Sequence, residues 1–446
     1  MSPGHTTIPV IFCGSYVDNN LPRKIMRGYC ETVNQGWIAM ITREENELLC
    51  RVTGDAPMGR MLRQHYWLPA ILSVRVRKGE APVRVKLFGR NFVAFRGRDG
   101  TVGFLDEACP HRGASLALAR VDDCSVTCLF HGWKINAGGE VLDVPNEPNN
   151  PSEFAKTVRA KGYPTREGAG LIWVWLGEGK APPAPDFEWM DLPPDQVYAA
   201  GIELNANWLQ GVEATIDSSH VALLHQSWTT SSATDFGATR VNTEVSYQLD
   251  KKPYGFRAAA LRSAADGSCL ARVTEFVMPY YGLIAPIYSG PQQDRTAIIA
   301  VPIDDENLIQ WYIYYNPEKP VDSWRKVQRA NQWPMAGGLP GDQTNSWGQN
   351  RQIMDAGNST GFHEIVIEDF VVMVSMGPIV DRTQEYLCSA DQAIVRVRRQ
   401  LLEEVRGFME GKPPRSGQSE SMSYKDIRAV GGRLASAAED WRQIPR

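Results

Sequence analysis

The stretches Cys109-Pro110-His111 and Cys128-Leu129-Phe130-His131 decide the interpretation of this 446-residue chain. Each one holds a thiol and an imidazole, and sixteen residues separate the two stretches. Gly113 and Gly132 come soon after them, so both stretches are typical of short loops. The residues between them are long enough to bring the loops face to face, and their four side chains then form one metal-binding set.

A small all-β domain is predicted around the two loops. From about Pro82 to Leu176 the apolar residues recur with a period of two, beginning at Val83-Arg84-Val85. Asp99-Gly100 supplies a hairpin turn, and Leu171–Leu176 is a wholly apolar strand.

Two kinds of metal centre fit these loops. Two thiolates and two imidazoles can hold one tetrahedral zinc ion, or a [2Fe–2S] cluster with both cysteines on one iron. The Cys-x-His spacing differs from the Cys-x2–4-Cys and His-x3–5-His pairs of zinc fingers. The pattern resembles the Rieske motif, which implies a [2Fe–2S] cluster held by Cys109, His111, Cys128 and His131. A structural zinc site is the alternative.

The rest of the chain predicts an α+β domain. Lys180–Pro185 is proline-rich and predicts a linker. Beyond it, we expect helices over Trp208–His225 and Asp391–Glu410, with strands over Ala297–Pro302 and Ile309–Tyr315. The expected division is an arm (1–41), a helical segment packing on the last domain (42–70), the β domain (71–178), a linker (179–195) and the α+β domain (196–446).

A histidine pair marks the start of the second domain. Glu213, Asp217 and His220 are spaced four and three apart, so on a continuous helix they share one face. His225 lies five residues beyond His220, about 140° away on a regular helix. Both imidazoles can reach one metal only if the helix ends or bulges between them.

Together with the cluster motif, this stretch resembles the Asp-x2-His-x4-His site of the Rieske non-haem iron oxygenases. The resemblance covers most of the chain, and Asn207-Trp208-Leu209-Gln210 is closest to the phthalate-dioxygenase-like branch. It implies a small all-β Rieske domain and a larger α+β catalytic domain with an antiparallel sheet, helices and a mononuclear Fe(II) site.

The family holds this iron with two histidines and a carboxylate, which implies His220 and His225 as ligands. The third ligand is expected at Asp369, because Gly377–Glu385 resembles the segment found after the iron-binding aspartate in this branch. The alternatives for the third ligand are Glu368, Glu364 and Asp355. His363 lies nearby, but the resemblance gives it no role.

Asp217 has a separate expected role. In the family, an aspartate at this position hydrogen-bonds an iron-ligating histidine and a Rieske histidine of the adjacent subunit. The resemblance therefore implies that Asp217 links His220 to His131 across a subunit interface. It also implies a homotrimer or a hexamer of stacked trimers.

The function implied is the oxygenase component of a multicomponent system, which uses O2 and electrons from a separate reductase or ferredoxin. The absence of a Gly-x-Gly-x-x-Gly fingerprint agrees with a separate NAD(P)H-dependent reductase. We expect phthalate-like ring hydroxylation of an aromatic carboxylate. The alternative is O-demethylation of a methoxylated, lignin-type aromatic acid with release of formaldehyde. From other classes, a Rieske electron-transfer protein without oxygenase activity and a zinc-stabilised binding protein stay open.

An anionic substrate favours an arginine near the iron. The candidates are Arg240, Arg257, Arg262 and Arg272. Three aromatic residues can line the pocket or pack in the core: Trp228, Tyr280 and Tyr281.

Composition excludes several other classes. With a net charge of −4 and no basic-aromatic clustering, neither nucleic acid nor an anionic membrane is an expected partner. No apolar run approaches the roughly 18 residues that a spanning helix needs. Eight cysteines are too few for a disulfide framework, so we expect a cytoplasmic protein. One hypothesis for residues 1–39 is that translation starts at Met40; a genuine arm is the alternative.

Overall fold

The computed structural model describes residues 41–228, 242–286, 293–322, 339, 341–418 and 420–445. Residues 1–40 of the predicted arm, the hypothetical start at Met40 and the candidate Arg240 lie outside the described residues.

Three small antiparallel sheets build the first half of the described chain. The strands are β1 (Trp67–Leu72), β2 (Val83–Leu87), β3 (Arg90–Arg96), β4 (Val102–Asp106), β5 (Arg120–Val121), β6 (Ser125–Thr127), β7 (Lys134–Asn136), β8 (Val141–Asp143), β9 (Thr165–Gly168) and β10 (Leu171–Trp175). Their orders are β1-β10-β9, β2-β3-β4 and β5-β6-β7-β8. A helix, α4 (Pro151–Thr157), comes after β8. The predicted small all-β domain is confirmed.

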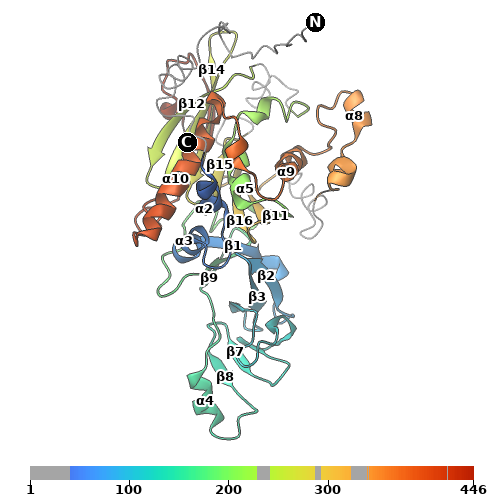
Figure 1. The fold of residues 1–446 in the computed structure, drawn as a ribbon, viewed down its shortest axis with the longest axis vertical. Coiled ribbons are helices and arrows are strands. Elements are labelled where there is room, and N and C mark those ends of the chain that lie inside the picture. The colour runs from blue at the N-terminus through green and yellow to red at the C-terminus, as the bar shows by residue number, and fades with distance from the viewer. Residues whose placement is uncertain are drawn as a thin grey trace, which may run out of the picture. The chain divides into compact units, whose positions relative to one another are not determined.

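The second half is built on an eight-stranded antiparallel sheet (Figure 1). Its strands are β11 (Val197–Leu204), β12 (Ser246–Lys252), β13 (Gly255–Ser263), β14 (Cys269–Val277), β15 (Tyr281–Ile284), β16 (Arg295–Pro302), β17 (Leu308–Tyr315) and β18 (Val430–Leu434). Seven of them run in the order β11-β17-β16-β15-β14-β13-β12, and β18 pairs with β14. The predicted α+β fold class is confirmed.

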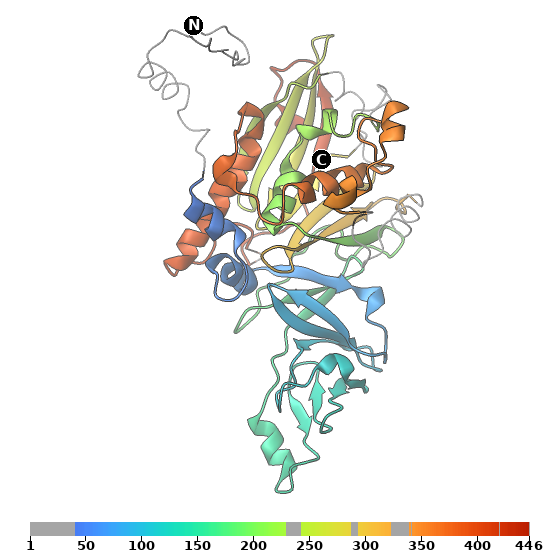
Figure 2. The same cartoon turned by 45° about the vertical axis from the view of Figure 1, so that its right-hand side comes forward.

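Helices accompany this sheet in the larger domain, and others precede the small sheets. They are α2 (Arg43–Cys50), α3 (Pro57–His65), α5 (Trp208–Ile216), α8 (Arg351–Asp355), α9 (Ile365–Ser375) and α10 (Gln392–Met409). Helix α5 lies against β15, β16 and β17, and it also contacts α9 and α10 (Figure 2). Helices α2 and α3 contact α10. Because α5 contacts α9, the histidine pair that follows α5 is brought near Asp369, the predicted third ligand, which lies on α9.

The helix expected over Trp208–His225 is wrong in its second half. Helix α5 ends at Ile216, and a 3-10 turn, η3, covers His220–Ala222. The Asp217 carboxylate accepts a hydrogen bond from the Ser219 amide at 2.6 Å, and the Ser218 amide donates to the Tyr247 hydroxyl at 2.8 Å. Side chains thus take over amides that a continuing helix would use.

The proline-rich segment after β10 is less exposed than a free linker. Phe187 and Trp189 are buried in the main hydrophobic core, and their rings stack with centroids 4.2 Å apart. Trp189 also packs against Tyr315 on β17. The second part of the segment is therefore held on the sheet.

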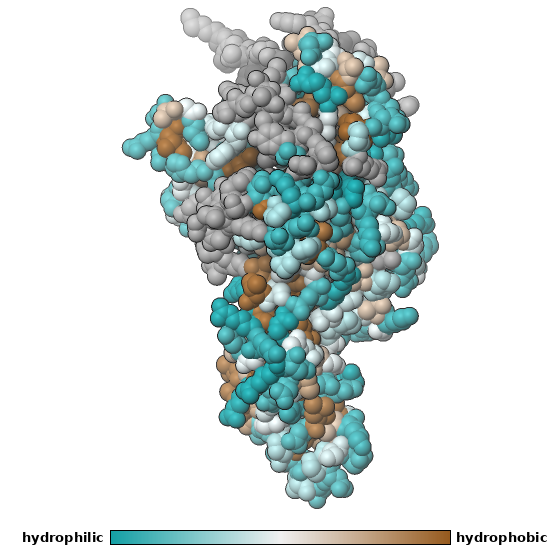
Figure 3. All heavy atoms as spheres, turned by 180° about the vertical axis from the view of Figure 1, so that it is seen from behind, coloured by the Kyte–Doolittle hydropathy of each residue, from teal (hydrophilic) through white to brown (hydrophobic). Residues whose placement is uncertain are grey.

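The surface of the described residues is mostly hydrophilic, with apolar patches on the part formed by the first domain, at the bottom of the view in Figure 3. Exposed apolar side chains in that domain include Leu118, Leu129 and Phe130. Among the described residues, no helix combines the length and the apolar character needed to cross a bilayer.

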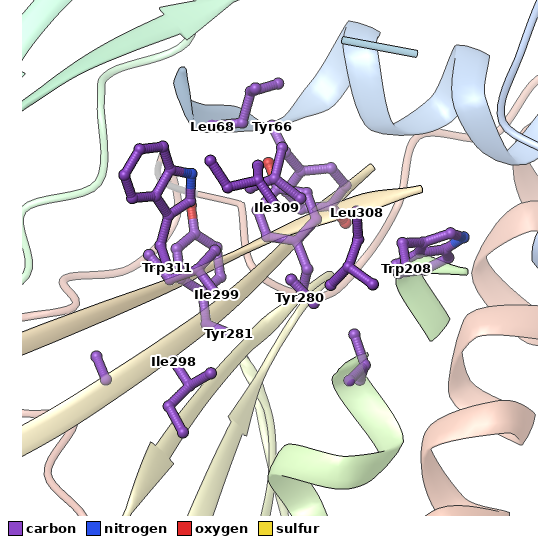
Figure 4. Packing of buried hydrophobic residues seen from close by; sticks show 14 of the residues in the cluster. Tyr66, Leu68, Trp208, Tyr280, Tyr281, Ile298, Ile299, Leu308, Ile309 and Trp311 are labelled. Carbon is purple, nitrogen blue, oxygen red and sulfur yellow. The ribbon is translucent and has the colours of Figure 1, made fainter. Parts of the chain in front are cut away.

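The main core joins the N-terminal helices to the large sheet. Figure 4 shows Tyr66 and Leu68 packed with Tyr280, Tyr281 and Trp311 over strands of that sheet. The hydroxyls of Tyr280 and Tyr281 both donate to the backbone oxygen of Trp67, at 2.7 and 3.0 Å. Both tyrosines are therefore core residues, which decides between the two roles left open for them.

A direct junction connects the small domain to the large sheet. The β2–β3 turn donates from Phe88 N to Pro302 O at 3.2 Å and from Gly89 N to Ile303 O at 2.7 Å. Lys86 also pairs with Asp304 at 2.7 Å. The small domain is therefore bonded to the β16–β17 turn through its backbone.

Candidate cluster and metal sites

The two loops of the small domain have the same backbone form. The Gly113 amide donates to Cys109 O, and the Gly132 amide donates to Cys128 O, each at 2.9 Å. Both glycines have φ of +77°, a conformation that other residues adopt only with strain. The glycine four residues after each cysteine therefore closes the loop.

The four predicted cluster residues lie together at the tips of these loops. The rings of His111 and His131 have centroids 4.5 Å apart, and Trp133 stacks on His111 at 4.7 Å. Cys109 and Cys128 are both buried. Burial, together with the adjacent Cys128 thiol, raises the pKa of Cys109 to about 11. A metal that binds here must therefore displace a proton from the thiol.

These residues fit a [2Fe–2S] group. Among the described residues, the buried Nδ1 atom of His131 has no hydrogen-bond partner. Buried polar atoms are nearly always satisfied, and ligation to iron would satisfy this one. The donor set of two thiolates and two imidazoles is that of a Rieske centre.

A second group of ligands lies where η3 meets α9. One donor atom from each of His220, His225 and Asp369 lies within 4.8 Å of the others. The Asp369 Oδ1 atom is 3.1 Å from His225 Nε2 and 3.5 Å from His220 Nε2. Two imidazoles and one carboxylate form the facial set of a mononuclear iron site that leaves coordination positions open.

A carboxylate faces the other nitrogen of each histidine. Asp217 Oδ2 lies 3.4 Å from His220 Nδ1, and Glu368 Oε2 lies 2.7 Å from His225 Nδ1. Both Nε2 atoms are therefore directed toward Asp369. Carboxylates in this position commonly orient metal-binding histidines.

The charges of the site shift two pKa values. Burial would lower the pKa of His225, but the carboxylates of Asp369 and Glu368 raise it to about 9. Burial would raise the pKa of Asp217, but hydrogen bonds from His220 and Ser219 hold it below its ordinary value. Asp217 is therefore ionised at neutral pH.

A cavity of about 140 Å³ opens beside this group. His220, His225 and Asp369 lie in its wall. The opposite part of the lining comes from the large sheet and includes Arg272, Thr274, Thr296, Ile298, Tyr312 and Tyr314. Among the described residues, the lining therefore combines the ligand group with aromatic rings, with Arg272 and with two further carboxylates, Asp217 and Asp294.

The candidate arginines in the described part of the chain lie at different places and have different partners. Arg272 lines the cavity and donates to the backbone oxygens of Ala285 and Pro286 at 3.0 and 3.1 Å. Arg262 is buried and donates to Ser218 O at 2.5 Å, beside Asp217. Arg257 pairs with Glu275 at 2.8 Å, and its guanidinium lies over the ring of Trp441.

The remaining candidates lie outside the ligand group. Asp355 is exposed on α8, and His363 is exposed before α9. Glu364 is the N-cap residue of α9 and is buried. Trp228 is partly exposed and is not among the residues that line the cavity. The helical face predicted for Glu213 and His220 does not form, because α5 ends at Ile216; Glu213 pairs with Arg382 and Arg398 instead.

Comparisons with known proteins identify the family. Residues 66–163 match the family "Rieske [2Fe-2S] domain", and residues 174–445 match "LigXa C-terminal domain like". The chain belongs to the Rieske non-haem iron oxygenases. It is an oxygenase subunit, and this family carries a Rieske [2Fe–2S] cluster and a mononuclear iron.

Curated relatives of this oxygenase span nearly its whole length. It is 36% identical to the phthalate 4,5-dioxygenase oxygenase subunit of Pseudomonas putida, over 84% of this chain and 88% of that protein. It is 32% identical to the 3-chlorobenzoate-3,4-dioxygenase oxygenase subunit of Comamonas testosteroni, over 90% of this chain and 97% of that protein. It is 28% identical to the 5,5'-dehydrodivanillate O-demethylase oxygenase subunit of Sphingobium sp., over 84% and 83%.

Solved structures of lower identity share the fold. Pseudomonas putida NdmA with caffeine aligns with a TM-score of 0.58 at 18% identity, over 86% of this oxygenase and all of that chain. The terminal oxygenase of carbazole 1,9a-dioxygenase from Novosphingobium sp. aligns with a TM-score of 0.56 at 19% identity, over 85% and 99%.

Sequence reasoning missed one contact of the site. The sequence makes Glu368 an alternative ligand, whereas the structure places its carboxylate on the far nitrogen of His225. The only signal for this contact is that Glu368 directly precedes Asp369. Neighbouring helix residues point about 100° apart, so the two carboxylates reach different sides of one ring.

Proposed function

We propose that this oxygenase subunit hydroxylates an aromatic carboxylate, using O2 and electrons from a separate NAD(P)H-dependent reductase or a ferredoxin. The observation that carries the proposal is the cavity that joins His220, His225 and Asp369 to Arg272 and to the rings of Tyr312 and Tyr314. A flat ring with an anionic group matches such a lining.

The ligand assignment is part of this proposal. Cys109, His111, Cys128 and His131 would hold the cluster, and His220, His225 and Asp369 would hold the Fe(II) ion. When bound, the cluster supplies electrons one at a time, and the iron supplies the site at which dioxygen is activated.

The protein's own residues then bind and orient the substrate. The Arg272 guanidinium attracts the substrate carboxylate, while Ile298 and the tyrosine rings cover the apolar face of the ring. The backbone bonds to Ala285 and Pro286 hold Arg272 in place, so one end of the substrate is fixed. The edge of the ring that faces the iron then decides which bond is attacked.

Turnover assays test the proposed reaction. The iron-loaded subunit is combined with a purified Rieske-oxygenase reductase and NADH, and phthalate and benzoate are supplied in turn. We expect substrate-dependent O2 uptake and a cis-diol product identified by mass. NADH oxidation without any oxygenated product from aromatic acids would contradict the proposal.

O-demethylation is the second candidate. It is favoured by the match of residues 174–445 to the LigXa-like family and by the similarity to a relative named as an O-demethylase subunit. The same cavity would then present a methoxy group, rather than a ring edge, to the iron. Formaldehyde release from a methoxylated aromatic acid would distinguish this reaction from ring hydroxylation.

We further propose that subunits associate head to tail as a trimer, alone or stacked into a hexamer, with Asp217 linking His220 to His131 of a neighbour. In support, Leu129 and Phe130 are more than half exposed at the cluster loops, at 55% and 57%. Leu223, beside η3, is exposed at 64%. Within residues 41–446, Figures 1 and 2 show β7 and β8 far from α5 and α9. Electrons would therefore have to cross between chains.

Two remaining assignments belong to the proposal. We infer a cytoplasmic location, supported by the six cysteines among the described residues, which are all free thiols. We also infer that residues 71–178 and 196–446 act as the Rieske and catalytic domains, with 42–70 packing on the latter. The contact of α2 and α3 with α10 supports that packing.

A further inference from the structure

Glu368 stands out because it is a fully buried carboxylate at a metal site that needs only one carboxylate. Its side chain has no exposed surface. One oxygen lies 2.7 Å from Nδ1 of His225, and the other accepts a hydrogen bond from the Thr360 hydroxyl. Burying a carboxylate is costly unless its oxygens are bonded, so both contacts stabilise the buried charge.

The geometry separates the tasks of two neighbouring residues. Asp369 reaches Nε2 of His225, whereas Glu368 reaches Nδ1 of the same ring. A histidine that binds a metal does so as the neutral imidazole, which carries a proton on only one nitrogen. A carboxylate that accepts from Nδ1–H therefore leaves the Nε2 lone pair on the side of Asp369.

The two histidines of the site differ in how firmly they are held. The Asp217–His220 contact is 3.4 Å, and both side chains are 25% exposed. The Glu368–His225 contact is shorter, and the two side chains are 0% and 5% exposed. The partly exposed Asp217–His220 contact is accessible to a neighbouring subunit. The buried Glu368–His225 contact can only fix the orientation of the His225 ring.

We propose that Glu368 is a positioning residue that fixes the orientation and tautomer of His225, and that Thr360 holds the Glu368 carboxylate in place. The proposal rests on the assignment of His220, His225 and Asp369 as iron ligands. A separate cavity of about 430 Å³ is lined by Thr360 and Glu368 but not by the three ligands. Thr360 and Glu368 therefore lie together in the wall of this second cavity.

Iron affinity is the direct readout. The mononuclear iron is removed from the holoenzyme with a chelator while visible absorption confirms that the cluster stays. Ferrous iron is then titrated anaerobically by equilibrium dialysis. We expect Glu368→Ala to weaken iron binding about 10- to 100-fold. Glu368→Gln keeps an acceptor oxygen, so its iron affinity should fall less. The iron affinity of Thr360→Val should fall least.

Ser375→Ala is the matched control. Ser375 lies on the same helix and donates to Val372 O at 2.7 Å, away from His225. This variant should bind iron like the wild type. The EPR spectrum of the ferrous–nitric oxide adduct adds a measure of ligand geometry, which should change in Glu368→Ala and be partly restored in Glu368→Gln.

The outcomes separate this inference from the proposed function. If Asp369→Ala binds ferrous iron as well as the wild type, the iron-site assignment itself is wrong. If Asp369→Ala loses iron but Glu368→Gln and Glu368→Ala retain wild-type affinity and spectrum, only the role of Glu368 is wrong. If Glu368→Ala fails to fold, Glu368→Gln and Thr360→Val decide by the same measurement.

Discussion

At the scale of single residues, Asp217 is the carboxylate whose exposure suggests a task beyond orienting His220. Its pKa lies below the ordinary value because of the bonds from His220 and Ser219, so it is negative at neutral pH. We expect Asp217→Asn to lower substrate turnover at least 10- to 100-fold while cluster and iron contents stay unchanged. Metal analysis measures the cluster and iron contents, and product formation measures turnover. Normal turnover with both metals loaded would exclude the bridging role.

Recognition of the negative charge of the substrate should depend on Arg272. A hydrogen bond to a charged group contributes about 1.5–3 kcal/mol. We therefore expect Arg272→Met to raise KM for an aromatic carboxylate about 10- to 100-fold and to change KM for its uncharged amide much less. Steady-state O2 uptake with the matched pair of substrates measures this. An equal loss for both substrates would indicate that Arg272 shapes the cavity rather than recognising charge.

Some of the site residues could be predicted from the sequence, and others could not. The residues proposed as cluster ligands and the histidine pair can be predicted from short spacings, and the structure brings the members of each set together. Which arginine faces the cavity could not be predicted, because β13 and β14 are buried along most of their length on both faces. Without an exposed face, a strand has no apolar–polar alternation from which the direction of Arg257, Arg262 or Arg272 can be deduced.

At the scale of elements, α5 is held by an ion network that connects four segments. Glu213 on α5 pairs with Arg382 at 2.9 Å and with Arg398 of α10 at 2.7 Å. Arg382 also donates to Asn46 of α2 at 3.2 Å. The network fixes the helix whose end carries the histidine pair. Its partners are far apart in sequence, so the helical pattern alone predicts α5 but not its anchors.

The Glu213 network predicts a pH-dependent stability. Burial would raise the pKa of Glu213, but Arg382 and Arg398 lower it to about 2 from an ordinary 4.5. Because the folded pKa is depressed, this contribution is present above about pH 4.5 and is lost as the pH falls toward 2. We expect Glu213→Gln to lower the free energy of unfolding by about 3–5 kcal/mol at pH 7.

Urea unfolding of both proteins measures that difference at several pH values. The difference in the free energy of unfolding between the wild type and Glu213→Gln should become smaller as the pH falls below 4.5. Lys412→Met, at an exposed pair with Glu410, is the control and should change stability by less than about 1 kcal/mol. A gap that stays constant down to pH 3 would contradict the assigned pKa.

At the scale of the whole molecule, the junction between the two domains depends on the Phe88-Gly89 turn. Gly89 has φ of +74°, and a Cβ atom there would lie 2.8 Å from Cγ2 of Thr53. A non-glycine residue in this conformation costs about 1–2 kcal/mol, before the contact with Thr53 is counted. We expect Gly89→Ala to loosen the junction while leaving cluster content unchanged.

Limited proteolysis checks this expectation. Cleavage near the β2–β3 turn should become faster in Gly89→Ala than in the wild type. Gly100→Ala is a matched control, since Gly100 also has positive φ but a Cβ there meets nothing within 4 Å. Equal cleavage of all three proteins would show that the turn does not hold the domains together.

The placement of Glu368 and Asp369 on opposite nitrogens of one imidazole has a thermodynamic consequence. Since both nitrogens of His225 face side chains of α9, any ion that binds the histidines also binds that helix to η3. Metal occupancy and local folding are then linked, and a bound ion lowers the population of locally opened states. Removing the iron should therefore speed amide hydrogen exchange across Ile365–Ser375, while exchange in Arg90–Arg96 of the small domain stays the same. The helix would serve as a reporter of whether the enzyme is loaded.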